Sequence, residues 1–465
     1  MTTETPGPAQ PGPGIGGEPA RTPHHGSALA EPVVRVRGGW TAAVVLANVG
    51  VFAAWLGPIQ VLLAQQSESV APGNKEFVLG LVTGVGAAVS VVANPVFGAL
   101  SDRTTSRFGR RTPWVLAGGI GGAVGLLVLS GSHAVLWMLV GWCLVQLFAN
   151  ALLAAITAAV PDLVPTGQRG VVGGWVALAQ TLGALVGVGL ATVVGGVRGG
   201  YLACAAFLLI AIVPYLLRSG DRPMVERTPL AWREFWKGFW ISPRRHPDFG
   251  WAWLTRFLLN LGNGLGTLYL FFYLQNAVGY ADPDVGVLVL TAIYSLCVIL
   301  TAVSSGAWSD RVGRRKVFVT GSGVVMAVAA VVLALWPTWP GAIVGAIVLG
   351  TGFGVYLSVD FALLTQVLPS ARDRAKDLGA IVLGTGFGVY LSVDFALLTQ
   401  VLPSARDRAK DLGVINIANS LPQVLAPAIA APVVKYAGGY PVLYGLAAAV
   451  TLLGAVLVRQ IRSVA

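Results

Sequence analysis

The sequence predicts an all-α membrane protein that crosses the bilayer many times. Hydrophobic residues make up 55% of its 465 residues and charged residues only 11%, whereas an average soluble domain carries about 25% charged residues. The apolar residues also gather in runs that are too long for the core helices of a globular protein. At about 20 residues per crossing, and with short loops between crossings, a chain of this length has room for roughly a dozen spans.

The apolar runs fall into two groups on either side of a polar stretch. The first group starts near Trp40, Glu76, Thr112, Ala134, Val171 and Gly200. The second group starts near Phe249, Asp284, Val317, Pro340, Gly379, Leu412 and Tyr440. We expect each run to be a helix, because backbone polar groups in lipid must be satisfied within the segment itself. The order is therefore six runs, a charged loop and seven runs.

This order divides the chain into parts with different expected roles. Residues 1–38 are rich in proline and glycine and lack the apolar stretch of a signal peptide, so we expect a disordered cytoplasmic tail. Residues 39–217 would form the first six-helix half, and residues 218–248 a charged cytoplasmic loop. Residues 249–459 would form the second half, followed by a short cytoplasmic tail at 460–465.

Lysine and arginine residues are divided unevenly between alternate loops, and this bias sets membrane orientation. With the N-terminus inside, most basic residues fall in the loop after the second run, the central loop and the loop after the eighth run. The outer loops hold only Lys75, Arg198 and Lys435. The net charge of +11 is thus explained by orientation, and nucleic-acid binding is not expected.

One segment of 34 residues occurs twice in tandem, because residues 346–379 and 380–413 are identical. Structural repeats in membrane proteins are normally weak in sequence, so this identity indicates either a very recent duplication or an artefact of sequence assembly. A thirteenth crossing would place the second SARDRAKD and the tail residues Arg459 and Arg462 outside, against the charge rule. We therefore expect twelve spans with both termini inside, and one surplus copy that is displaced, re-entrant or poorly packed.

Two similar loops follow the second and the eighth run. They read GALSDRTTSRFGRRTPW from Gly98 to Trp114 and GAWSDRVGRRK from Gly306 to Lys316. Each contains a glycine, then Ser-Asp-Arg, then Gly-Arg-Arg, at the cytoplasmic end of an even-numbered run. The glycines allow neighbouring helices to approach closely. The aspartates can cap a helix N-terminus or pair with arginines.

These paired loops resemble the signature of the major facilitator superfamily, over essentially the whole chain beyond the tail. The resemblance implies the major facilitator fold, with two six-helix halves, and a cytoplasmic gate whose arginines pair with acids such as Asp162. The alternative is that the arginines only enforce orientation, which would require neither the aspartates nor the glycines. The gate residues are Gly98, Asp102, Arg103, Arg107, Gly109, Arg110, Arg111, Asp162, Gly306, Asp310, Arg311, Gly313, Arg314 and Arg315.

Three segments resemble one branch of that superfamily, which contains sucrose transporters and related glycoside–cation symporters. They are SDRTTSRFGRR, DFALLTQVLP and NIANSLPQVLAP. The match is imperfect, because Thr112 stands where that branch usually has a third arginine. The fifth run, QTLGALVGVGLATVV, lacks the Gly-Pro signature of antiporters, which disfavours a drug exporter.

Few charged residues fall inside the predicted spans, and charges inside a bilayer are usually functional. Arg256 lies in the seventh run and Asp360 in the tenth, with Asp394 as its duplicate. Their depths are similar, about 10 Å and about 13 Å from the cytoplasmic ends of their spans. The resemblance places these two spans beside the central cavity, so we expect Arg256 and Asp360 to face each other, with Asp360 as a protonatable coupling group. The alternatives are a static buried pair and an arginine that reaches the interface.

Neutral polar residues in the four spans that would line the cavity are further binding candidates. Amides and aromatic rings suit sugar hydroxyls and ring faces, although a single amide is more often an interhelical hydrogen bond. These candidates are Asn48, Gln60, Gln146, Asn150, Asn260, Asn263 and Tyr269. No metal or cofactor is expected, because the cysteines have no metal spacing and the glycine-rich run at 350–354 lacks the Lys-Ser/Thr of a P-loop.

Taken with the resemblance, these residues predict a secondary transporter that works by alternating access. We expect it to take up a sugar or glycoside together with a proton or another cation, as a monomer in the plasma membrane. The alternative transport function is export of a drug or metabolite. A membrane enzyme would need a convergent acid–base or metal constellation, and a non-transporting sensor would usually carry a soluble signalling domain, and the sequence contains neither.

Overall fold

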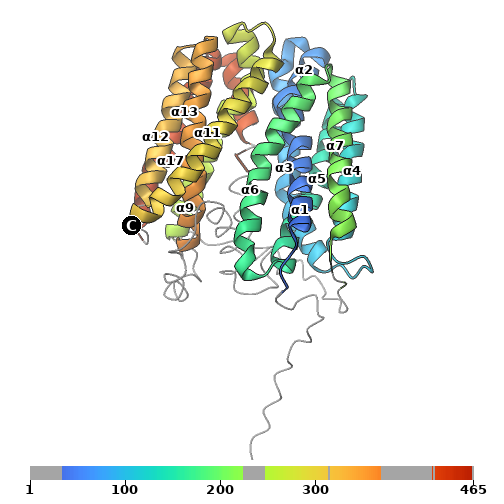
Figure 1. The fold of residues 1–465 in the computed structure, drawn as a ribbon. Coiled ribbons are helices and arrows are strands. Elements are labelled where there is room, and N and C mark those ends of the chain that lie inside the picture. Colours follow the sequence, from blue (N-terminus) through green and yellow to red (C-terminus); the bar gives the residue numbers. More distant parts are fainter. Residues whose placement is uncertain are drawn as a thin grey trace, which may run out of the picture.

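A computed structural model describes residues 34–221, 223, 247–312, 315–367, 421–422 and 425–462 of the chain, without the side chains of a few residues within these ranges. In these ranges the secondary structure is helical and there is no strand. The helices run roughly parallel to one another and form two bundles (Figure 1). The described part of the chain thus has the all-α architecture that the apolar runs predict.

The first bundle begins with a long span made of three consecutive helical segments. α1 (Gly38–Gly57) continues through a π-helical turn, η1 (Pro58–Leu62), into α2 (Leu63–Val70), so that 33 residues form one candidate span. After a short turn, η2 (Pro72–Asn74), five long helices follow. These are α3 (Lys75–Asp102), α4 (Thr112–Ser130), α5 (Val135–Leu163), α6 (Thr166–Val193) and α7 (Val197–Arg218).

The second bundle begins with a bent span. α9 (Pro247–Leu268) meets α10 (Leu270–Tyr273) and the π-helical turn η3 (Leu274–Val278) at an angle of 47°. The remaining elements are α11 (Pro283–Val312), α12 (Arg315–Leu335), α13 (Trp339–Val367), a shorter apolar helix (Leu425–Tyr436), α17 (Gly439–Leu457) and η4 (Val458–Gln460).

The described residues contain ten helices that are long and apolar enough to cross a membrane, or eleven if the bent pair counts as one span. This confirms the predicted polytopic all-α class. α13 includes residues 346–367 of the first repeat copy. The second copy, 380–413, lies outside the described residues. The prediction that one copy is surplus therefore stays a prediction.

The two bundles repeat the same packing scheme. In the first, α3 packs on α5, α4 on both α5 and α7, and α1 on α7. In the second, α11 packs on α13, α12 on both α13 and α17, and α9 on α17. The equivalent helices follow one another in the same order in both halves, as expected for a parallel structural repeat. α6 and α11 lie side by side where the bundles meet (Figure 1).

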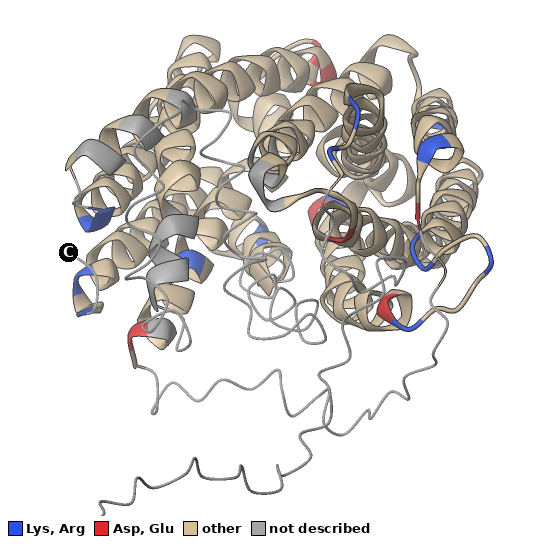
Figure 2. Ribbon diagram, turned by 60° about the horizontal axis from the view of Figure 1, so that its bottom comes forward, with Lys and Arg blue, Asp and Glu red and all other residues tan. Residues whose placement is uncertain are grey.

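The two ends of the molecule differ in the elements that they carry. We call the end with the Gly98–Trp114 loop the motif end, and the opposite end, which carries α2, the far end (Figure 1). Figure 2 looks onto the motif end and shows that charged residues lie mostly at helix ends, while the helix bodies are largely uncharged. This distribution is the one that a lipid environment requires.

A buried amide organises the far end of the first bundle. The Gln66 side-chain nitrogen in α2 donates to the Leu129 carbonyl at 2.8 Å, to the Ser132 carbonyl at 3.0 Å and to the Ser132 hydroxyl at 2.8 Å. The Tyr201 hydroxyl in α7 donates to the Gln66 side-chain oxygen at 2.9 Å. One side chain that is only 3% exposed thus joins α2 to the α4–α5 turn and to α7.

Replacing Gln66 with leucine is expected to destabilise the protein by about 2–3 kcal/mol, because it removes the acceptor of the buried Tyr201 hydroxyl and the side-chain donor to the Ser132 carbonyl. The midpoint of thermal unfolding in detergent should fall by several degrees. The matched control is Gln65→Leu, since the half-buried Gln65 side chain makes no hydrogen bond with the described residues. Equal shifts for the two variants would show that the amide network contributes nothing specific.

Candidate functional site

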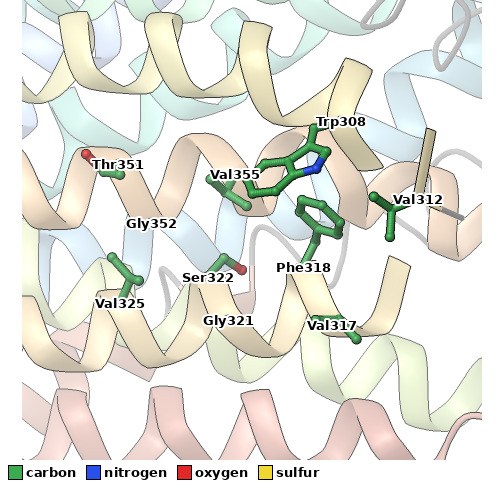
Figure 3. Close-up of a pocket in the computed structure, with 10 residues that line it drawn as sticks. All are labelled: Trp308, Val312, Val317, Phe318, Gly321, Ser322, Val325, Thr351, Gly352 and Val355. Atoms are coloured by element: carbon green, nitrogen blue, oxygen red, sulfur yellow. The ribbon is translucent and has the colours of Figure 1, made fainter. Parts of the chain in front are cut away.

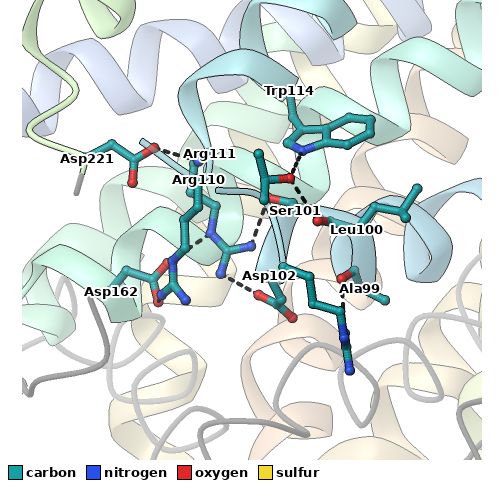
Figure 4. Close-up of polar contacts among 11 residues, drawn as sticks. Ala99, Leu100, Ser101, Asp102, Arg110, Arg111, Trp114, Asp162 and Asp221 are labelled. Carbon is teal, nitrogen blue, oxygen red and sulfur yellow. Dashed lines mark hydrogen bonds and ion pairs between the residues drawn. The ribbon is translucent and has the colours of Figure 1, made fainter. Parts of the chain in front are cut away.

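The first signature loop holds a compact cluster of buried charges (Figure 4). Arg111 pairs with Asp102 at 2.5 Å and with Asp162 at 2.9 Å, and its guanidinium also donates to the Ser101 hydroxyl at 2.9 Å. Arg110 pairs with the other oxygen of Asp162 at 2.5 Å. Both arginine side chains are almost fully buried. The cluster ties the ends of α3 and α5 to the start of α4.

The carboxylates determine the charge state of Arg111. Burial alone would lower the pKa of its guanidinium, but the neighbouring carboxylates of Asp162 and Asp102 outweigh burial and raise that pKa. Arg111 therefore stays a cation at every accessible pH. The predicted pairing of the loop arginines with Asp162 is present, and it lies within one half of the molecule.

Asp221, just after α7, caps the start of α4. Its carboxylate accepts the backbone N–H groups of Arg111 at 2.5 Å and Thr112 at 2.9 Å, and the Thr112 hydroxyl at 3.3 Å. Gly109 has a positive φ of 94°, and a side chain there would collide with this carboxylate. The sequence left two roles open for the loop aspartates, capping a helix or pairing with arginines; Asp102 pairs with Arg111, and the cap of α4 comes from the central loop. Thr112, which stands where the sucrose-transporter branch usually has an arginine, donates two of these hydrogen bonds to Asp221.

Other loop residues have local roles. Gly98 is buried in α3. Arg103 donates to the Ala99 carbonyl at 3.0 Å, and its Nε is buried without a partner among the described residues. The Arg107 guanidinium lies 4.7 Å from the centre of the Phe108 ring. In the second loop, Arg315 is the first residue of α12. The other predicted gate residues of this loop lie outside the described residues, or their surroundings do; these are Gly306, Asp310, Arg311, Gly313 and Arg314.

Polar side chains gather near the middle of the first half. The Asn150 carboxamide oxygen in α5 accepts from the Ser90 hydroxyl at 3.3 Å and from the Asn94 amide at 3.2 Å, both in α3. Its nitrogen donates to the Gln146 carbonyl at 2.8 Å and lies 3.4 Å from the Gln146 side-chain oxygen. We call these four residues the amide cluster. It unites two of the predicted binding candidates, Gln146 and Asn150.

A second polar group lies near the middle of α9. Arg256 is only 2% exposed. One turn further on, the Asn260 amide donates to the Arg256 carbonyl at 2.9 Å and to the Tyr356 hydroxyl of α13 at 3.2 Å. The seventh and tenth spans are therefore in contact. Asp360 lies in α13, but its side chain, like Asp394, lies outside the described part of the chain.

The remaining candidates occupy different places. Asn48 donates to the Val44 carbonyl at 2.9 Å, and the side-chain oxygens of Asn48 and Asn263 are buried without partners among the described residues. Gln60 accepts from the Thr291 hydroxyl at 3.0 Å, and Tyr269 donates to the Glu76 carbonyl at 3.0 Å. Gln60 and Tyr269 thus join the two halves at the far end.

A network that the sequence did not indicate connects the halves at the far end. Lys75, at the start of α3, pairs with Glu68 at 2.7 Å and donates to the Gln275 oxygen at 2.9 Å. The Gln275 side-chain nitrogen donates to the two Glu68 carboxylate oxygens at 2.9 and 3.1 Å. We call Glu68, Lys75 and Gln275 the far-end latch. Lys435 also bonds to Asn74 across the halves. The sequence marks Lys75 only as a rare outer lysine.

Replacing Lys75 with alanine is expected to weaken the link between the halves by about 1 kcal/mol, roughly a fivefold change in the ratio of closed to open far ends. Spin labels at the exposed positions Gly73 and Asp282, in a background without the native cysteines, would report this by double electron–electron resonance as a larger long-distance population. Arg198→Ala is the control, because Arg198 is exposed and has no partner among the described residues. An unchanged distribution in Lys75→Ala would contradict the latch.

The fold and the charge cluster define a multi-span membrane transporter built from two helical repeats. The model of the Major Facilitator Superfamily matches residues 40–376. That range is more than half of the chain, and the protein therefore belongs to the Major Facilitator Superfamily. The family membership confirms the transporter class and indicates that the protein is not an enzyme.

A solved structure has the same fold. The crystal structure of the human organic anion transporter MFSD10 (TETRAN) superposes with a TM-score of 0.62 at 16% sequence identity, covering 90% of this chain and 98% of that chain. At this identity the likeness establishes the fold alone. No curated protein matches the sequence.

Proposed function

We propose that the protein is a secondary active transporter that works by alternating access and takes up a sugar or glycoside with a proton or another cation. In this proposal it is a monomer in the plasma membrane, with both termini in the cytoplasm. The observation that carries the proposal is the buried cation Arg256 beside the Asn260–Tyr356 contact between α9 and α13. A buried charge at this depth is costly and is normally retained for function.

The register of α9 and α13 supports a coupling pair. The two helices are antiparallel, because two further spans lie between them in the chain. Arg256 is one turn before Asn260, and Asp360 is one turn after Tyr356. Both positions therefore lie on the same side of the observed Asn260–Tyr356 hydrogen bond, one turn away from it. We infer that Arg256 and Asp360 are neighbours and that Asp360 carries the coupling proton.

The far-end latch supports alternating access. Its hydrogen bonds close the far end between the two halves, as an inward-facing state requires. Arg111 and Arg110 remain paired with Asp162 in this same state. A gate at the motif end would therefore use other arginines of the loop. We assign this contact to Arg103 and Arg107, which form no ion pair with the described residues.

The amide cluster supports a polyhydroxylated substrate, because neutral amides hydrogen-bond to hydroxyls without a charge that would bind ions instead. Its position near the middle of α5 agrees with the midplane location of transporter binding sites. Asn260 is at a similar position in α9. A sugar could therefore be held between the two halves.

Uptake of labelled disaccharides into proteoliposomes under an imposed pH gradient tests the proposal. The double variant Asp360→Asn with Asp394→Asn, which also changes the repeated copy, is expected to abolish accumulation while it retains exchange of substrate across the membrane. Asp284→Asn, at the start of α11, is the control for removal of a carboxylate. Accumulation at the normal level in the double variant would exclude the coupling role.

Export of an organic metabolite is the second candidate. The buried guanidinium of Arg256 favours it, because a guanidinium can hold a carboxylate through two parallel hydrogen bonds. The structurally similar protein MFSD10 is an organic anion transporter. The same proteoliposomes distinguish the two candidates. Transport that is inhibited by small carboxylates and unaffected by disaccharides would favour the metabolite.

A further inference from the structure

The second half carries an apolar groove that transport does not explain. α11, α12 and α13 border a space of about 380 Å³ (Figure 3). The space is open to the outside, because its lining residues Trp308, Val312 and Val317 are exposed. Valines, Phe318 and Trp308 line it, and Gly321 and Gly352 leave its floor without side chains. A side-chain carbon at Gly321 would meet no atom of the described residues within 4 Å, so this part of the chain leaves the space above the glycine open.

The groove offers no free hydrogen-bonding group along its floor. The Ser322 hydroxyl donates to the Val319 carbonyl at 2.9 Å, and the Thr351 hydroxyl donates to the Ile347 carbonyl at 2.7 Å. Both hydroxyls are therefore satisfied within their own helices. A polar solute would lose its hydration in such a groove without compensation, whereas a hydrocarbon chain would not.

The length of the groove matches one leaflet. Its α12 side runs from Val317 to Val325, and a rise of 1.5 Å per residue gives about 12 Å along the helix. Half of a hydrocarbon core of about 30 Å is about 15 Å. At the motif end of the groove, the Trp308 and Phe318 rings meet edge to face with centroids 5.5 Å apart. An exposed tryptophan is typical of the membrane interface.

Arg315 and Lys316, the first residues of α12, stand next to this end of the groove. Lys316 precedes the lining residues Val317 and Phe318, and it forms no ion pair or hydrogen bond with the described residues. The sequence from 310 to 316 contains four basic residues and one acid. The positive end of the α12 dipole adds to this charge. Basic clusters between membrane helices at the cytoplasmic face bind anionic lipid headgroups.

We propose that the groove between α11, α12 and α13 binds an anionic phospholipid, with one acyl chain along Gly321 and the phosphate on Lys316. The acyl chain supplies apolar contacts along the groove, and the phosphate supplies an anionic partner for Lys316, which has none among the described residues. The site is on the lipid-facing side of the second half and is separate from the amide cluster and Arg256. It does not depend on the transported substrate.

Native mass spectrometry of the full chain, with phosphatidylglycerol or phosphatidylcholine of identical acyl chains, tests this proposal. The unaltered protein should retain phosphatidylglycerol about fivefold more than phosphatidylcholine, as expected for about 1 kcal/mol from one lysine. Lys316→Gln should lose this preference. Gly321→Phe should fill the groove and lose both lipids. The control Val328→Phe introduces the same aromatic side chain at an exposed position of α12 outside the groove and should bind as the unaltered protein does.

Equal retention of the two lipids by the unaltered protein would overturn the headgroup assignment. Retention by Gly321→Phe at the level of Val328→Phe would overturn the groove assignment. Dimers that form without lipid and disappear in Gly321→Phe would show that a second copy of the chain occupies the groove instead. If Gly321→Phe does not give a monodisperse protein, Thr351→Trp fills the groove from α13 and carries the same expectation.

Discussion

Replacing Arg111 with alanine is expected to lower stability by about 3–5 kcal/mol, the usual cost of removing one partner from a buried ion pair. Arg111 is 3% exposed and holds Asp102, Asp162 and Ser101 at once. Its loss leaves Asp102 without its cation and separates the end of α3 from the start of α4. Most of the purified variant should fail to give a monodisperse peak at a temperature that the unaltered protein tolerates.

Two further variants separate charge from geometry in this prediction. Arg111→Lys keeps the charge but cannot contact two carboxylates and a hydroxyl through one planar fork, so it should be intermediate. Arg107→Ala removes an arginine from the same loop, but Arg107 is exposed, and its one contact with the described residues is with the Phe108 ring. It should unfold at the temperature of the unaltered protein. If all three variants behave alike, the ion pairs do not hold the loop.

Changing Gly187 to alanine is expected to cost about 3 kcal/mol, the upper end of the usual range for overpacking. In the α1–α6 contact, a side-chain carbon at Gly187 would lie 2.5 Å from the Ala53 carbonyl oxygen and 2.8 Å from the Ala53 Cα. A carbon at the facing Gly57 would lie 2.5 Å from the Gly187 oxygen. These neighbours are backbone atoms, so the clash cannot be relieved by a change of rotamer.

The matched control for this prediction is Gly189→Ala in the same helix. A carbon at Gly189 would meet only Leu288, at 4.0 Å. Both variants gain the same helix propensity, so the difference between their thermal unfolding midpoints isolates the helix contact. Gly187→Ala should unfold several degrees below Gly189→Ala. A smaller or reversed difference would show that α1 and α6 can separate at no cost.

The candidate site was predictable where its signal was local. The motif GALSDRTTSRFGRR indicated a charge cluster, because it places an Asp, several Arg and two Gly within one loop, and membrane orientation alone would require neither the Asp nor the glycines. Arg256 was visible because a single charge stands out in an apolar run. Gln60 and Tyr269 were equally visible, but polarity within a span does not reveal which face it occupies. Both join the halves at the far end.

By itself, the sequence determined the helical class, the order of the spans, the repeated loops and the family, because hydropathy and charge bias act along consecutive residues. Only the tertiary structure decided the partners. Asp221 caps a helix about 110 positions earlier in the chain, and Lys75 bonds to Gln275 across 200 positions. Such contacts depend on how the helices pack. In another arrangement of the helices, the same side chains would form hydrogen bonds with other partners.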